Sequence, residues 1–200
     1  MDLSLIDEAR VFHFGTLSLT EEPARSATQQ AVAYAKRAGK LVTFDPNLRK
    51  PLWKDEACAR EQLLWGLAQA DVVKISDDEV DFLFGMEPQQ GAEYILEHFP
   101  AQLVFVTCGA GGCWFRNAAA SGHVPSLSGI SVVDTTGAGD IFGGSVIWQL
   151  LQTGKAPRDL TEPELREAVS FACTAAGLST TRPGGISSIP TLEEVQAARR

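Results

Sequence analysis

The 200-residue chain has little positive charge for its size. It carries 17 lysines and arginines against 25 aspartates and glutamates, which gives a formal net charge of −8 at pH 7. Proteins that bind nucleic acid hold its phosphates with clusters of basic residues, so nucleic acid is not expected as the main partner. A small anion is still compatible with this charge, because a local group of backbone amides can bind one.

Metal-binding side chains and long apolar runs are also scarce. The four cysteines form no C-x-x-C pair and the three histidines are scattered, which predicts reduced thiols and no metal site built from these residues. No apolar run approaches the roughly 18 residues needed to span a membrane. The acidic N-terminus lacks the basic region of a signal peptide. We therefore expect a cytoplasmic protein without membrane contact.

What the sequence does contain is an alternation of short apolar runs with helical segments, and no interdomain linker. This pattern predicts one domain over residues 1–200, with βαβ units, right-handed crossovers and a mostly parallel sheet covered on both faces. The expected strands are residues 11–14, 41–44, 72–75 and 103–107, with a hairpin strand at 113–116 and short strands within 123–133. The expected helices are residues 23–38, 55–70, 77–84, 91–99, 139–151, 164–180 and 191–200.

The most informative segment is the glycine-rich run from Val132 to Asp140. Val132 and Val133 are typical of the end of a strand, and an apolar helix follows the glycines. Such a turn directs backbone amides and the positive end of a helix dipole at one point, which suits a phosphate. A phosphate repels the carboxylate of Asp140, so we expect that carboxylate to accept a proton from an attacking hydroxyl. The alternative is a plain glycine-rich helix start.

Three further polar loops are expected at the same sheet edge, because ligands of parallel sheets bind at the carboxyl ends of the strands. In the loop 45–49, Arg49 can hold a phosphate or a sugar oxygen, unless the loop is only a capped turn. The acids of 76–79 suit Mg²⁺ and its waters, or form a helix capping box. The glycines of 107–112 allow close approach of a base or phosphate, or make a tight turn.

Two other nucleotide motifs are excluded by the sequence. There is no G-x-x-x-x-G-K-[ST], so the chain is not a P-loop protein. A dinucleotide-binding unit requires a second strand with an acidic residue about 20 residues on, and Gly137-Ala138-Gly139 is not followed by such a strand.

The segment 134–140, with Phe142, Gly143 and Gly144, resembles the C-terminal signature of the ribokinase/PfkB family of carbohydrate kinases. The segments 44–49 with Trp53, and 74–79, resemble its fructokinase branch. The resemblance implies a ribokinase-like three-layer αβα sandwich. It also implies ATP-dependent phosphorylation of a primary hydroxyl of a ketose, with fructose first. The alternatives are 2-keto-3-deoxygluconate kinase, aminoimidazole riboside kinase, or an inactive nucleotide-binding fragment.

The resemblance also implies a role for individual residues, with ATP, Mg²⁺ and K⁺ as the expected ligands. Asp140 matches the catalytic base, and Glu79 matches the acid that organises Mg²⁺ through water, although Ser76 stands where many members have Asn. The helix carrying residues 172–176 is expected beside the adenine. The remaining matches are Gly137, Ala138 and Gly139 for the anion hole; Thr107, Gly109, Gly112 and Lys74 for the nucleotide; Asn47 and Arg49 for substrate or phosphate; and Asp134, Thr136, Ser179, Gly184 and Ser188 for K⁺.

The resemblance covers only the C-terminal two thirds of family members. The first strands, a glycine-rich sugar-binding motif and the small β lid over the sugar are expected to be missing from this chain. That lid is often the dimer interface in the family, which makes a homodimer a candidate assembly. We expect the 200-residue chain alone to transfer phosphate weakly or not at all.

Overall fold

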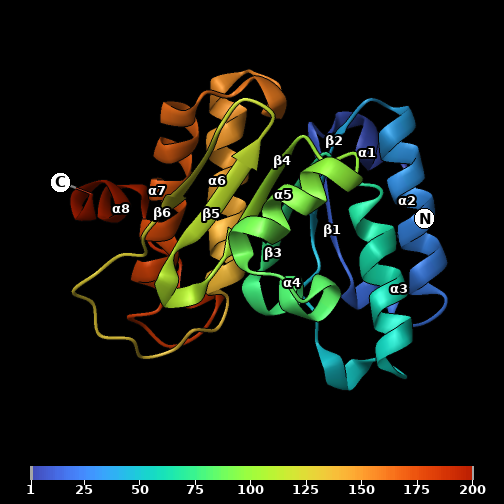
Figure 1. Cartoon of the computed structure of the whole chain (residues 1–200), viewed down its shortest axis with the longest axis horizontal. Helices are drawn as coiled ribbons and strands as arrows, with labels where there is room; N and C mark the ends of the chain where they lie inside the picture. The colour runs from blue at the N-terminus through green and yellow to red at the C-terminus, as the bar shows by residue number, and fades with distance from the viewer. Residues whose placement is uncertain (1, 200) are drawn as a thin grey trace. The chain divides into compact units, whose positions relative to one another are not determined.

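The structure, a computed structural model, describes residues 2–199 and is a mixed α/β fold (Figure 1). Its six-stranded sheet has the strand order β1-β2-β3-β4-β5-β6. Two compact units follow each other along the chain, one up to Phe105 and one from Val106 onward. In the described part of the chain, no helix has the length and apolar character needed to cross a membrane.

The first unit contains the parallel strands. β1 pairs with β2 and β2 pairs with β3, both in parallel register, with Phe14 opposite Phe44 and Phe44 opposite Val73. The bounds are α1 (Ser4–Glu8), β1 (Val11–Gly15), α2 (Ala24–Arg37), β2 (Leu41–Asp45), α3 (Glu56–Leu67), β3 (Val72–Ser76), α4 (Asp77–Phe84), α5 (Pro88–His98) and β4 (Leu103–Thr107), which reaches into the second unit.

The second unit contains an antiparallel hairpin and the longest helices. β5 and β6 pair with Cys113 opposite Val124, and α7 packs on α6 and on the hairpin. The bounds are β5 (Cys113–Asn117), β6 (Ser121–Val124), α6 (Ala138–Thr153), α7 (Glu162–Ser179) and α8 (Leu192–Ala198), with short 3₁₀ turns at Gly109–Gly111, Pro157–Asp159 and Ile186–Ser188. Arg200, the predicted end of the last helix, lies outside the described residues.

Burial along the strands shows that the sheet is covered on both faces. Successive strand residues point to opposite faces, and Leu103, Val104, Phe105 and Val106 of β4 are all fully buried. This burial agrees with the sheet covered on both faces that the alternation of strands and helices predicts.

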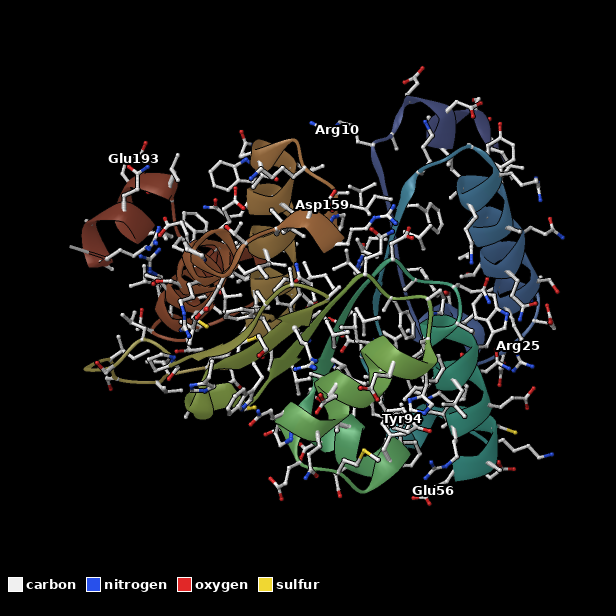
Figure 2. All side chains as sticks on the ribbon, turned by 45° about the horizontal axis from the view of Figure 1, so that its top comes forward. Arg10, Arg25, Glu56, Tyr94, Asp159 and Glu193 are labelled. Atoms are coloured by element: carbon white, nitrogen blue, oxygen red, sulfur yellow. The ribbon has the colours of Figure 1, made fainter. Side chains whose placement is uncertain are left out.

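Two close contacts fix the helices of the first unit. A methyl group added to Gly66 of α3 would lie 2.2 Å from the Phe44 ring, so only glycine lets α3 pack this closely on β2. Arg25 of α2, labelled in Figure 2, donates to the carbonyls of Leu19 and Thr20 at 2.8 and 2.6 Å. These bonds anchor the segment between β1 and α2.

One predicted element is wrong. Residues 125–137 contain no strand, and Val132 and Val133 are 59% and 62% exposed. The amide of Val133 donates to Thr180 O at 2.7 Å, at the end of α7, instead of to a strand. The glycine-rich turn therefore follows a long segment without a strand (Figure 1), and the hydrogen bond to Thr180 at the end of α7 holds this segment in place.

Candidate active site

The glycine-rich turn before α6 depends on a left-handed glycine. Gly137 has φ 78° and ψ −1°, a conformation that favours glycine, and its added Cβ would lie 3.2 Å from Gly185 Cα. α6 begins at Ala138, whose amide donates to Thr135 O at 3.2 Å, and the N-cap residue Gly137 provides no side-chain cap. First-turn amides have no acceptor within their own helix. Together with the helix dipole, they make the turn suitable for an anion.

Asp140 is the third residue of α6, and its side chain is exposed. The backbone therefore places a carboxylate within the same helical turn as the anion-binding amides. An exposed carboxylate at this position can accept a proton from a hydroxyl that approaches the bound anion.

Asp134 fixes the start of the turn. Its Oδ2 accepts from the Gly184 amide at 2.8 Å and its Oδ1 accepts from the Thr136 amide at 2.9 Å. These hydrogen bonds, with that from Gly184 contributing most, lower the pKa of Asp134 to about 2. Asp134 is thus ionised at neutral pH and ties the turn to the segment that follows α7.

The residues predicted for K⁺ gather in one part of the second unit. Asp134 joins Thr136 and Gly184 directly, as described above. The buried hydroxyls of Ser179 and Ser188 donate to backbone carbonyls, at 2.8 Å to Ala176 and at 2.9 Å to Gly185. The structure therefore assembles oxygen atoms from three separate chain segments around the turn.

The loop after β4 turns sharply on glycines with positive φ. Gly109 has φ 51° and Gly112 has φ 90°. A Cβ at Gly112 would lie 2.1 Å from Val124 O, so the loop presses directly against β6. Thr107 is the last residue of β4 and opens this loop. This geometry confirms the predicted tight turn, and the close approach of a base or phosphate stays a prediction.

In the first unit, Lys74 forms a buried ion pair. Its Nζ lies 2.9 Å from Oδ2 of Asp45, with side-chain exposures of 13% and 7%. The sequence singles out Lys74 but misses this partner. The pair could have been predicted from position, because Asp45 and Lys74 lie near the carboxyl ends of the neighbouring parallel strands β2 and β3.

Glu79 of α4 binds backbone amides on both sides. Its Oε2 accepts from Ser76 N at 2.9 Å, while Ser76 Oγ accepts from Glu79 N, which completes the predicted capping box. Its Oε1 accepts from Leu48 N at 2.7 Å, which anchors the loop after β2. Among the described residues, no three His, Cys, Asp or Glu side chains form a metal-binding group.

The same loop holds Asn47 and Arg49. Asn47 has φ 51°, an uncommon conformation outside glycine. Arg49 is exposed, and its Nη1 donates to Leu48 O at 3.2 Å. The hydrogen bond from Leu48 to Glu79 and the turn at Asn47 thus fix the backbone from which the Arg49 side chain extends.

A cavity of about 510 Å³ in the second unit adds apolar residues that the sequence predictions do not include. Asp140 and Gly137 lie at this cavity, and the rest of its wall is mostly apolar, including Trp148 of α6, Phe171 of α7 and Val195 of α8. The residues come from helices far apart in the sequence, so only the tertiary fold reveals the cavity.

The fold and the turn define a ribokinase-like α/β protein. Residues 1–192 match the model of the pfkB family carbohydrate kinases, and the chain belongs to this family. Probable fructokinase-7 of Arabidopsis thaliana is 38% identical over 201 residues, an alignment that covers 98% of this chain and 57% of the relative. The chain thus spans little more than half the length of that relative.

Solved structures support the same family. A fructokinase from Vibrio cholerae O395, bound to fructose, ADP and a calcium ion, has a TM-score of 0.86 and 30% identity. That match covers 98% of this chain and 64% of the other. Aminoimidazole riboside kinase from Salmonella enterica, complexed with aminoimidazole riboside and an ATP analog, has a TM-score of 0.82 and 28% identity, covering 94% and 62%.

Proposed function

We propose that the chain carries the phosphate-transferring part of an ATP-dependent sugar kinase, with fructose as the first candidate acceptor. The observation that carries this proposal is the turn into α6, which places Asp140 in the same helical turn as anion-binding amides. Binding of an anion alone does not favour a carboxylate there, whereas proton transfer from an acceptor hydroxyl does.

Each residue has one role in the proposed reaction. The amides of Gly137, Ala138 and Gly139 bind the anionic group that is transferred, and Asp140 accepts the proton of the attacking primary hydroxyl. ATP supplies the phosphoryl group, and Mg²⁺ neutralises charge on its phosphates. A proton acceptor of this kind contributes about 10²–10⁴-fold to the rate.

The described side chains fit the proposed cofactors. A carboxylate has about four acceptor sites, and the two backbone amides at Glu79 occupy two of them, so Glu79 can also accept from waters of Mg²⁺. The oxygen atoms around ionised Asp134 suit a monovalent cation such as K⁺. Asn47 and Arg49 are proposed to contact phosphate or substrate, and Lys74 is proposed to contact the nucleotide. Thr107, Gly109 and Gly112 are proposed to contact the nucleotide.

The family match covers both compact units, which supports the prediction of one kinase domain. The fructokinase relative and the fructose-bound neighbour favour a ketose. The neighbour that holds aminoimidazole riboside favours a second candidate acceptor. The partial length relative to these proteins favours a third outcome, nucleotide binding without turnover.

The test combines calorimetry of ATP binding with a coupled assay on fructose and aminoimidazole riboside. Gly137→Ala, which adds a Cβ at a positive φ beside Gly185, is expected to weaken ATP binding about tenfold. Gly154→Ala is the matched control, because Gly154 also has positive φ (66°) but nothing within 4 Å of the added Cβ. No ATP binding by the unaltered chain, or equal loss in both variants, would refute the proposal.

A further inference from the structure

The loop after β4, proposed above to contact the nucleotide, is held by two side chains that the sequence predictions did not include. His123 Nε2 lies 2.7 Å from Gly111 O, and Ser126 Oγ donates to Ala110 O at 2.6 Å. Both carbonyls belong to the short 3₁₀ turn Gly109–Gly111. Two consecutive carbonyls of the turn therefore accept hydrogen bonds from residues of β6 and of the segment directly after it.

Three backbone hydrogen bonds close the turn itself. Gly111 N donates to Cys108 O at 2.7 Å, Gly112 N donates to Gly109 O at 3.1 Å, and Cys108 N donates to Gly112 O at 2.8 Å. Glycines lose the most conformational freedom on folding, so a turn of this composition is costly to keep in one conformation. External hydrogen bonds to its carbonyls reduce that freedom before any ligand arrives.

The position of His123 is itself fixed. Its ring lies 4.8 Å from the ring of Trp114, its partner across the β5–β6 hairpin. Its backbone carbonyl accepts from Arg166 Nη1 of α7 at 2.9 Å. The imidazole must carry a proton on Nε2 to donate to the Gly111 carbonyl, and both the Nε2–H tautomer and the protonated ring satisfy this requirement.

The same segment connects the loop to the anion-binding turn. Directly after Ser126, Leu127 packs against α7, where a Cβ added to Gly177 would lie 2.7 Å from Leu127 Cβ. Three residues further along the chain, at the C-cap of α7, Thr180 O accepts from the amides of Val133 and Asp134. The end of α7 therefore contacts both the segment that holds the loop and the segment that begins the turn.

We infer that His123 and Ser126 are positioning residues, which hold the Gly109–Gly112 backbone in the conformation that receives the nucleotide. They act through the loop and do not touch the ligand. This inference rests on the proposed function for its ligand, ATP, but its effect on the loop is measurable without ATP. Preorganisation of this kind improves binding because less conformational freedom is lost when the ligand arrives.

The test uses the 200-residue chain with His123→Ala, Ser126→Ala and His123→Gln. Glutamine Nε2 can donate to the same carbonyl, so it should restore what alanine removes. His98→Ala is the matched control, since His98 also bonds a carbonyl (Tyr94 O, 2.9 Å) and stacks on an aromatic ring (Tyr94, 4.0 Å), but on α5. The readouts are hydrogen exchange of the amides of residues 108–112 without ligand, and the Kd of ATP by calorimetry.

We expect either alanine variant to raise the exchange rate of these amides and the Kd of ATP by about three- to tenfold, the range of one exposed hydrogen bond. His123→Gln and His98→Ala should stay within about twofold of the unaltered chain. Unchanged loop exchange in both alanine variants would overturn the inference. So would unchanged Kd in a chain that binds ATP. A chain that binds no ATP overturns the proposed function, and the nucleotide role of the loop with it.

Discussion

The two groups of candidate site residues are built in different ways. In the first unit, the side chains of Asp45 on β2, Lys74 on β3 and Glu79 on α4 are largely buried, and each bonds a neighbouring segment. In the second unit, the turn around Gly137 presents backbone amides, and Asp140 is exposed. The comparison separates buried groups that bond neighbouring segments from an exposed carboxylate with a proposed role in proton transfer.

The difference has a physical reason. A buried charge must keep its partner, because its removal leaves an uncompensated charge in a medium of low polarity. The charge of an exposed carboxylate is largely solvated by water, so its removal should cost less stability than removal of a buried charge. Substitutions in the two groups should therefore separate activity from stability.

The largest expected effect is on phosphoryl transfer, through the proposed proton acceptor Asp140. Asp140→Ala should lower phosphoryl transfer by about 10²–10⁴-fold or more while it leaves the Kd of ATP nearly unchanged, because the carboxylate serves the acceptor and not the nucleotide. The measurement is turnover in a coupled assay beside calorimetry, using a form of the kinase that has turnover. Near-normal kcat would remove Asp140 from the mechanism. A large loss of stability would remove the contrast with the first unit.

The next effect is on stability, through the ion pair of the first unit. Asp45→Ala leaves the Lys74 ammonium 13% exposed without its partner, and should lower the free energy of unfolding by about 3 kcal/mol. Urea denaturation measures this change. The double variant Asp45→Ala with Lys74→Met, which removes both charges, should recover much of the loss. If the double variant is as unstable as the single one, the pair is not the cause.

A smaller effect concerns the pH dependence that Asp134 gives the second unit. Its pKa is about 2 in the folded chain against an ordinary value of 3.8. Because the folded pKa is depressed, its contribution to stability is present above about pH 4 and is lost as the pH falls toward 2. Urea unfolding between pH 2 and 5 should show a weaker pH dependence in Asp134→Asn than in the unaltered chain. Identical pH profiles would contradict the hydrogen-bonded carboxylate.

The smallest effects are those of His123→Ala and Ser126→Ala, at about three- to tenfold on the Kd of ATP. These two variants test whether the backbone of the Gly109–Gly112 loop depends on the side chains of His123 and Ser126 to keep its conformation. The controls and contradicting outcomes are those given above.

Local patterns predicted the strands, most helices and the capping boxes. The apolar runs of β2, β3 and β4 are confirmed, and Ser76 with Glu79 forms the expected cap. Val132 and Val133 were interpreted as a strand end because β-branched pairs favour strands. The structure shows them exposed instead, since the backbone at Val133 bonds the end of α7.

The sequence by itself determined the family, the α/β class and the glycine-rich turn before Asp140, because these depend on local backbone preferences and on a long, specific motif. Only the tertiary structure decided the partners. It paired Lys74 with Asp45, joined Asp134 to Gly184 across 50 positions, and placed His123 against Gly111. Such contacts join residues that are distant in the chain, and no local pattern encodes the distance between them.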